Sequence, residues 1–183
     1  MRKLSVFNFA TLNGFYKGAN DDISWHKHGD DEGFAAQGAG SGSTLVFGRV
    51  TYEMMNRFWP TPEAMAAMPE VAKGMNAAEK IVFSNTLKTA SWNNTRIVKG
   101  DIIEEMKKLK QQPGVGLTIL GSGSIVTQFA GHGLIDHFMF MLDPVAIGEG
   151  TSLFKGLTRT LELKLTDSRT FKNGMVLLNY ERK

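Results

Sequence analysis

The sequence of 183 residues contains no cysteine. Disulfide bonds, thiolate metal ligands and a cysteine nucleophile are therefore excluded, and a reducing compartment such as the cytoplasm is expected. No apolar run approaches the roughly 18 residues that a membrane-spanning helix needs. The basic and apolar start of the chain is interrupted by Asn8 and Thr11, and no small-residue cleavage site follows it. It predicts a strand and not a signal peptide, so we expect a cytoplasmic protein without membrane contact.

The chain also has little excess of either charge. Its 21 basic and 18 acidic residues leave a net charge of +3, and the basic residues are scattered. This weak, dispersed charge argues against a nucleic-acid partner but helps a small anionic ligand to approach. With 42% hydrophobic and 21% charged residues, the composition is that of an ordinary globular protein. We expect residues 1–183 to form one domain with one core.

Short apolar runs bounded by turn residues predict strands in the first two thirds of the chain. They lie at 3–10, 44–48, 80–84, 95–99 and 115–120. Helical patterns lie between or after them at 51–58, 101–112 and 124–131, with a further short helix near 30–38. Segment 59–79 carries three prolines and predicts a partly helical excursion over the surface. Thr51 is placed to cap the first turn of its helix. Asp101 and Glu104 form a capping-box pair, and Glu104 can also reach Lys108 one turn further on.

The pattern changes after residue 134. A long apolar strand at 134–142 is stopped by Asp143 and Pro144, and 161–166 alternates apolar and polar residues. Asn173-Gly174 is a strong hairpin signal that returns the chain through 175–180. Alternating strands and helices followed by a hairpin predict an α/β fold. We expect a mixed, mostly parallel central sheet flanked by helices, with a C-terminal antiparallel hairpin.

Three polar turns follow predicted strands. Arg49 comes directly after 44–48, Ser84 begins the turn after 80–84, and the glycines of "LGSGSIV" follow 115–120. Each turn alone has an ordinary explanation: a surface ion pair, a polar turn, or a glycine turn. Together they lie at the strand ends, where ligands bind in open α/β sheets, and a helix start favours an anion. A P-loop is excluded because Ser124 and Ile125 stand where lysine and serine are needed, and a Rossmann motif lacks its third glycine at Val126.

The segments "GRVTYE", "KIVFSNTL", "ILGSGSIVTQF" and "LIDHFMFMLDPVAIGEGTSLF" together resemble the dihydrofolate reductase-like superfamily. The sequence is most similar to the reductase domain of the bacterial bifunctional deaminase-reductase of riboflavin biosynthesis and its stand-alone relatives. This resemblance covers nearly the whole chain and implies a dihydrofolate reductase-like fold that binds NADPH. The cofactor-binding residues that it implies are Ala10, Arg49, Thr51, Ser84, Thr86, Gly121, Gly123, Ser124 and Ile125. Asn85 departs from the pattern, since relatives often have a basic residue there, and Asn13 stands where many have aspartate.

The resemblance also implies a substrate pocket. In "ISWHKHGDDEGF", Trp25, Asp30 and Phe34 match a tryptophan, an acid and a phenylalanine that line the pterin pocket of dihydrofolate reductase, and Thr151 matches a pocket threonine. Asp30 is then the candidate for substrate anchoring or proton supply. A solvated helix start is the alternative interpretation of Asp30 and its acidic neighbours.

The remaining histidines and methionines predict no further site. His26 and His28 have no evident third ligand, so we expect solvated side chains and no metal. His137 lies in an apolar strand and is expected in the core, and packing is expected for Met54, Met55, Met139 and Met141.

We therefore expect an NADPH-dependent reductase that acts on a small pyrimidine, pterin or flavin-related heterocycle. The 5-amino-6-(5-phosphoribosylamino)uracil reductase of riboflavin biosynthesis is the example that the resemblance supplies, although no second phosphate clamp is evident. The competing hypotheses are an NADP(H)-binding module without turnover and an interaction domain with structural glycine turns. The apolar residues of 59–79 and 137–142 favour a homodimer.

Overall fold

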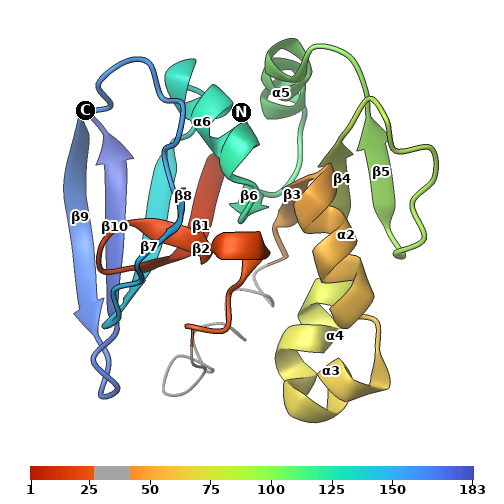
Figure 1. Ribbon diagram of the computed structural model, residues 1–183. Helices are drawn as coiled ribbons and strands as arrows, with labels where there is room; N and C mark the ends of the chain where they lie inside the picture. Colours follow the sequence, from red (N-terminus) through yellow and green to blue (C-terminus); the bar gives the residue numbers. More distant parts are fainter. Residues whose placement is uncertain (27–41) are drawn as a thin grey trace.

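The computed structural model describes residues 1–26 and 42–183, which build a mixed eight-stranded sheet in the order β5-β4-β3-β6-β1-β7-β10-β9 (Figure 1). Its strands are β1 (Leu4–Thr11), β3 (Thr44–Gly48), β4 (Lys80–Phe83), β5 (Thr95–Val98), β6 (Leu117–Leu120), β7 (His137–Asp143), β9 (Leu163–Thr170) and β10 (Val176–Arg182). The strands from β5 to β7 in this order run parallel to one another. β10 is antiparallel to both β7 and β9. The predicted mostly parallel sheet and C-terminal hairpin are confirmed.

A second, two-stranded sheet was not predicted. It pairs β2 (Phe15–Gly18) with β8 (Gly150–Ser152) in antiparallel fashion. Both strands are short and lack a clear alternation, so the sequence gives them no periodic signal. Figure 1 shows this small sheet in front of β1 and β7, and η1 (Ala19–Asp21) follows β2 directly.

The helices follow the predicted pattern closely. They are α2 (Arg49–Phe58), α3 (Pro62–Ala67), α4 (Pro69–Ala77), α5 (Ile102–Gln111) and α6 (Gly123–Gly131). The prolines of the predicted excursion begin α3 and α4, since proline suits the first helical position. The predicted short helix near 30–38 lies outside the described residues. Among the described residues, no helix is both long enough and apolar enough to cross a membrane.

Helices cover both faces of the parallel strands, and alternate residues of each strand face opposite sides. Val46 of β3 packs in a core cluster with residues of α5 and α6, such as Met106 and Phe129. Phe47, the next residue, packs in a second cluster with Tyr52 of α2. This double burial explains why the central strands are continuous apolar runs.

The predicted caps of α2 and α5 have different outcomes. Thr51 does not cap α2, because the helix begins two residues earlier with Gly48 as its N-cap, and Thr51 Oγ1 accepts from Ser122 N instead. Asp101 caps α5 as predicted, by accepting from the backbone N–H groups of residues 103 and 104. Glu104, however, pairs with Lys107 and not with Lys108. On a helix, the side chains three and four residues after Glu104 are both within its reach, and the ion pair forms with the nearer one in sequence, Lys107.

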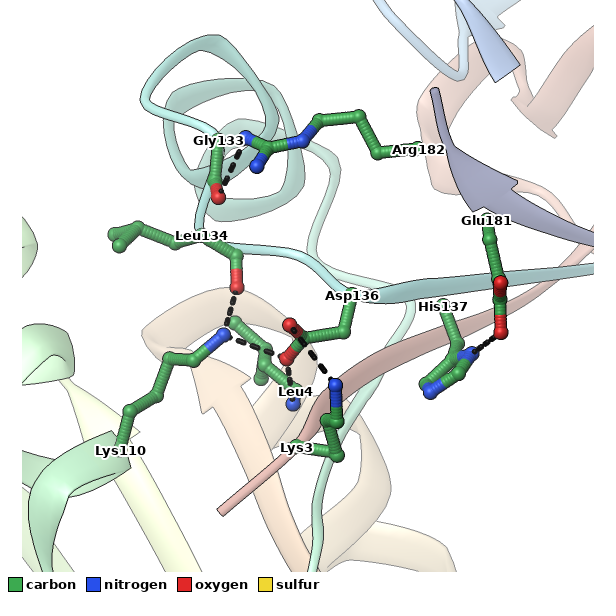
Figure 2. Close-up of polar contacts among 9 residues, drawn as sticks. All are labelled: Lys3, Leu4, Lys110, Gly133, Leu134, Asp136, His137, Glu181 and Arg182. Carbon is green, nitrogen blue, oxygen red and sulfur yellow. Dashed lines mark hydrogen bonds and ion pairs between the residues drawn. The ribbon is translucent and has the colours of Figure 1, made fainter. Parts of the chain in front are cut away.

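A polar network closes the amino ends of the parallel strands (Figure 2). Asp136, just before β7, accepts from Lys110 Nζ at 2.6 Å and from Leu4 N at 2.8 Å, and Lys3 lies 3.9 Å away. Lys110 also donates to Leu134 O at 2.5 Å. Burial opposes the charge of Asp136, but the hydrogen bonds from Lys110 and Leu4 outweigh it and lower the pKa of this carboxyl below its ordinary value. The network ties α5 to β1 and β7, so this edge of the sheet is structural.

His137 differs from its predicted place in the core. Its side chain is 38% exposed, and its Nδ1 lies 3.3 Å from Glu181 on the neighbouring β10 (Figure 2). As the first residue of β7 it lies at the rim of the apolar strand, where a polar partner is within reach.

A fully buried lysine lies at the same amino edge, at the start of β4. Lys80 Nζ donates to the carbonyls of Asn76, Ala78 and Asn93, and it lies 4.5 Å from the centroid of the Trp92 ring. Burial lowers the pKa of Lys80 to about 8. The ammonium group thus joins the end of α4 to the loop before β5.

Candidate functional site

A large cavity opens at the carboxyl ends of β1, β3 and β6, with a volume of about 940 Å³. It extends from Gly121 and Ser122 down the sheet face to Ser5 and Thr118. Its walls are mainly apolar and aromatic and include Phe7, Phe9, Leu120, Met55, Trp59 and Met75. Pockets of roughly 300–1,000 Å³ hold small ligands and cofactors, so this cavity has room for two ring systems.

The glycine turn between β6 and α6 lies at the mouth of this cavity. Its central residue, Ser122, is buried and has a left-handed backbone with φ of 56°. Ser122 Oγ accepts from Gly48 N at 3.0 Å, and Ser122 N donates to Thr51 Oγ1 at 3.1 Å. These bonds fix the ends of β3 and β6 against each other. A non-glycine residue in this conformation is uncommon, and the tertiary bonds stabilise it.

Both predicted glycines of this turn are required by close neighbours. A Cβ on Gly121, whose φ is +60°, would lie 3.2 Å from Thr51 Cγ2. A Cβ on Gly123 would lie 2.7 Å from Tyr16 Oη. The tyrosine ring of β2 therefore lies directly against the start of α6. The first backbone N–H groups of a helix have no acceptor within it, and they favour an anion at this point.

Arg49 lies at the same edge of the sheet, as the first residue of α2. Its side chain is 45% exposed and pairs with Glu53 one turn later, at 3.0 Å. Such exposed pairs contribute only about 0.3–0.5 kcal/mol. The ion pair with Glu53 holds the guanidinium group along α2 and leaves it accessible to solvent.

The third predicted turn has a local structural role. Ser84 Oγ accepts from the N–H groups of Thr86 and Leu87 at 3.2 and 2.9 Å. Asn85 Oδ1 accepts from Gly100 N at 2.8 Å and so joins the ends of β4 and β5. None of these residues is among the described residues that line the cavity.

The structure brings some of the predicted site residues together. Trp25, Thr51 and Gly121 line the cavity, and Gly123 adjoins it through Tyr16. The other described candidates are not among the lining residues: Ala10, Arg49, Ser84, Thr86, Ser124, Ile125 and Thr151. Ala10 and Ile125 are buried, and Thr151 pairs with Lys17 across the small sheet. Asp30 and Phe34 lie outside the described residues, so their roles stay predictions.

A buried histidine–aspartate pair at the cavity was not predicted from the sequence. His26 Nδ1 lies 3.0 and 3.1 Å from the two carboxylate oxygens of Asp143, the last residue of β7. The side chains are only 8% and 4% exposed, so the expectation of a solvated His26 is wrong. The His26 ring also packs on Phe9, with centroids 3.8 Å apart. A separation of 117 residues hid the pair, because no local pattern joins its two members.

Two charged side chains of the cavity wall, Lys17 and Asp21, are paired with each other. Lys17 bonds to Asp21, and this hydrogen bond raises the pKa of Lys17 above its ordinary value. Trp25 is fixed nearby, because its Nε1 donates to Asp22 O at 3.2 Å. Within residues 1–26 and 42–183, no group of three or more histidine, aspartate or glutamate side chains is arranged to hold a metal ion.

The mixed, mostly parallel sheet with its C-terminal antiparallel hairpin is the predicted dihydrofolate reductase-like fold. The sequence model of the family described as the RibD C-terminal domain matches residues 2–177. The chain belongs to this family, which is one of reductases and implies a nicotinamide cofactor.

Individual relatives agree with this assignment. YyaP of Bacillus subtilis (strain 168), described as uncharacterised, is 32% identical over 179 residues, which are 98% of this chain and 94% of YyaP. A protein of Shewanella sp. PV-4, provisionally named for riboflavin biosynthesis, has a similar structure with a TM-score of 0.75 at 20% identity, covering 99% of each chain. The diaminohydroxyphosphoribosylaminopyrimidine deaminase/5-amino-6-(5-phosphoribosylamino)uracil reductase of Thermotoga maritima gives a TM-score of 0.70 at 13% identity, with all of this chain matching 57% of that one. The two structural likenesses establish the fold.

Proposed function

We propose that the protein is an NADPH-dependent reductase that transfers a hydride to a small, planar heterocycle. The observation that carries this proposal is the glycine turn at the start of α6, which opens on a largely apolar cavity of about 940 Å³. Membership of a reductase family supports the same chemistry. When bound, the cofactor supplies the hydride, and the protein supplies alignment of the two rings and exclusion of water.

The residues of the turn fit a dinucleotide. The N–H groups at the start of α6 suit a pyrophosphate. Arg49 then offers its guanidinium donors to the adenosine 2′-phosphate, because arginine stays ionised and bonds phosphate oxygens in pairs. Glu53 holds Arg49 at the rim and must share it with that phosphate.

The cavity wall suits an apolar ring better than a phosphorylated sugar. Phe9, Trp25 and Met139 offer flat or polarisable surfaces to a planar ring. Among the described lining residues the fixed cations are Lys17, which is bonded to Asp21, and Arg57. We therefore propose an unphosphorylated pyrimidine, pterin or flavin-type compound as the substrate.

The test is oxidation of NADPH by the purified protein with a panel of such heterocycles, each offered with and without a ribosyl phosphate. The proposal expects turnover with at least one unphosphorylated member and weaker use of NADH. NADPH binding without turnover on any member would favour a cofactor-binding module. If neither NADPH nor NADH binds, the glycine turn is structural, and an interaction domain is the better description.

We also propose a homodimer in the cytoplasm, for which one of the two expected surfaces is available. Residues 137–142 form an internal strand, and Phe138 and Met141 are buried within the chain. The other expected segment, 59–79, includes α3, where Met65 is 37% exposed, and a further exposed apolar side chain, Leu165 at 50%, lies on the edge strand β9.

A further inference from the structure

We propose that Asn8 binds the carboxamide group of the nicotinamide ring in this cavity. Its side-chain oxygen, Oδ1, accepts a hydrogen bond from the carboxamide N–H and so determines how the ring is turned. This inference rests on the proposed reductase function and adds to it a residue that recognises the reactive half of the cofactor.

The amide of Asn8 lies at the glycine turn, and one of its two ends is already bonded. Asn8 belongs to β1, lines the cavity and is only 4% exposed. Its Nδ2 donates to Gly121 O at 3.4 Å. Its Oδ1 lies 4.0 Å from the position that a Cβ on Gly121 would take. Because a carbonyl oxygen can only accept, the bond to Gly121 turns the NH₂ group toward the turn and leaves Oδ1 as the unbonded end.

The oxygen of this amide is available to a ligand. No described residue donates a hydrogen bond to Asn8 Oδ1, and this atom is not enclosed by the protein. Buried side-chain amides in folded proteins generally bond through both ends, since an unpaired acceptor loses its hydrogen bonds to water. A donor on a molecule that enters the cavity would complete the bonding of this amide.

The other polar side chains at the turn already have partners. Thr51 Oγ1 accepts from Ser122 N at 3.1 Å. Ser122 Oγ accepts from Gly48 N at 3.0 Å and donates to Leu120 O at 3.3 Å. These bonds join strand ends, so breaking them would disturb the turn itself. Asn8 can accept from a ligand without giving up a bond.

The face of the sheet assigns Asn8 to the cofactor and not to the heterocycle. Successive residues of a strand point to opposite faces. Phe9 and Met139, proposed above to contact the heterocycle, pack in a cluster that contains no described residue of α6. Val6, two positions before Asn8, packs in a cluster with Phe129 of α6. Asn8 therefore lies on the side of β1 that faces α6, whose first N–H groups are proposed to bind the pyrophosphate.

The chemistry of the ring identifies the group that Asn8 would bind. A nicotinamide ring carries one hydrogen-bond donor, the NH₂ of its carboxamide, and the cavity around Asn8 is mainly apolar. A ring turned over about its bond to the ribose would carry this NH₂ away from Oδ1. The hydrogen bond would thus select one face of the ring for hydride transfer, and such positioning of a reacting group is how alignment contributes to rate.

The test compares two ligands by calorimetry: NADP⁺ and its 3-acetylpyridine analogue, in which a methyl group replaces the carboxamide NH₂. Wild-type protein should bind NADP⁺ about 2- to 10-fold more tightly, the usual effect of one neutral hydrogen bond. Asn8→Leu has a similar volume but no acceptor, and it should bind the two ligands equally. Asn8→Asp keeps an acceptor oxygen and should keep the preference for NADP⁺.

The matched control is Arg49→Ala, which acts at the phosphate end that both ligands share. It should weaken both by the same factor and leave the preference unchanged. Because each variant is judged by the ratio of two affinities, a general loss of stability does not imitate the expected result.

Equal affinities in the wild type would overturn this inference, even if Asn8→Leu fails to fold. A preference for NADP⁺ that persists in Asn8→Leu would also overturn it, since another group would then bind the carboxamide. Both results leave the proposed reductase function in place. A wild type that binds neither NADPH nor NADP⁺ would overturn that function together with this inference.

Discussion

Replacing Gly123 by alanine should displace Tyr16 and destabilise the protein. The new Cβ would lie 2.7 to 2.9 Å from three atoms of the tyrosine ring and hydroxyl, closer than side chains tolerate. The ring packs against the core cluster that includes residues of α6, so it cannot move aside without losing those contacts. Overpacking of this kind costs about 1–3 kcal/mol. In a chain of this length that loss lowers Tm by roughly 2–12 °C, which thermal unfolding measures directly.

Two further variants separate this contact from a general effect on α6. Gly131→Ala adds the same atom at the other end of the helix, where nothing lies within 4 Å, and it should leave Tm unchanged or slightly higher. Tyr16→Ala combined with Gly123→Ala should cost less than the two single changes together, since the clash is then absent. Equal Tm values for Gly123→Ala and Gly131→Ala would refute the reasoning, and so would strict additivity in the double variant.

Three other outcomes are expected. Arg49→Ala should weaken NADPH binding by about 10- to 100-fold in calorimetry, because one charge-assisted hydrogen bond is lost, and it should weaken NADH binding much less. Equal losses for the two cofactors would show that Arg49 does not bind the 2′-phosphate. The free energy of unfolding should rise by an amount on the order of 1–3 kcal/mol between pH 8 and pH 10.5. In this range Lys80 keeps its proton in the unfolded chain but loses it in the folded protein, where its pKa is about 8. Urea unfolding of Lys80→Met should lack this rise. Light scattering at micromolar concentration should give a dimer, and a monomer mass would end that proposal.

Local patterns predicted the elements of this fold well where they were strong. The apolar runs became β3 and β4, and Asn173-Gly174 became the hairpin between β9 and β10, where Gly174 has φ of +88°. These features are determined by neighbours in sequence, through burial and turn geometry. β2 and β8 were missed because each is short and its strand partner lies more than 130 positions away in the chain.

The candidate site was predictable only in part, for the same reason. The glycines of the turn between β6 and α6 predicted its position. The left-handed conformation of Ser122 between them could not be predicted, because it depends on hydrogen bonds to Gly48 and Thr51 beyond the end of β3. His26 looked like a solvated loop residue until Asp143 and Phe9 were placed beside it. Long-range pairs of this kind leave no periodic trace in one sequence.

Deuterium transfer from the cofactor to a heterocycle would show directly that the protein is a reductase. The protein would be given NADPH carrying deuterium at the transferable position of the nicotinamide ring, together with a heterocycle that supports turnover. The account predicts one deuterium on the reduced carbon of the product, detected by mass spectrometry, for each NADPH consumed. Oxidation of the cofactor with no deuterium in the product, or no oxidation with any heterocycle of the panel, would contradict it.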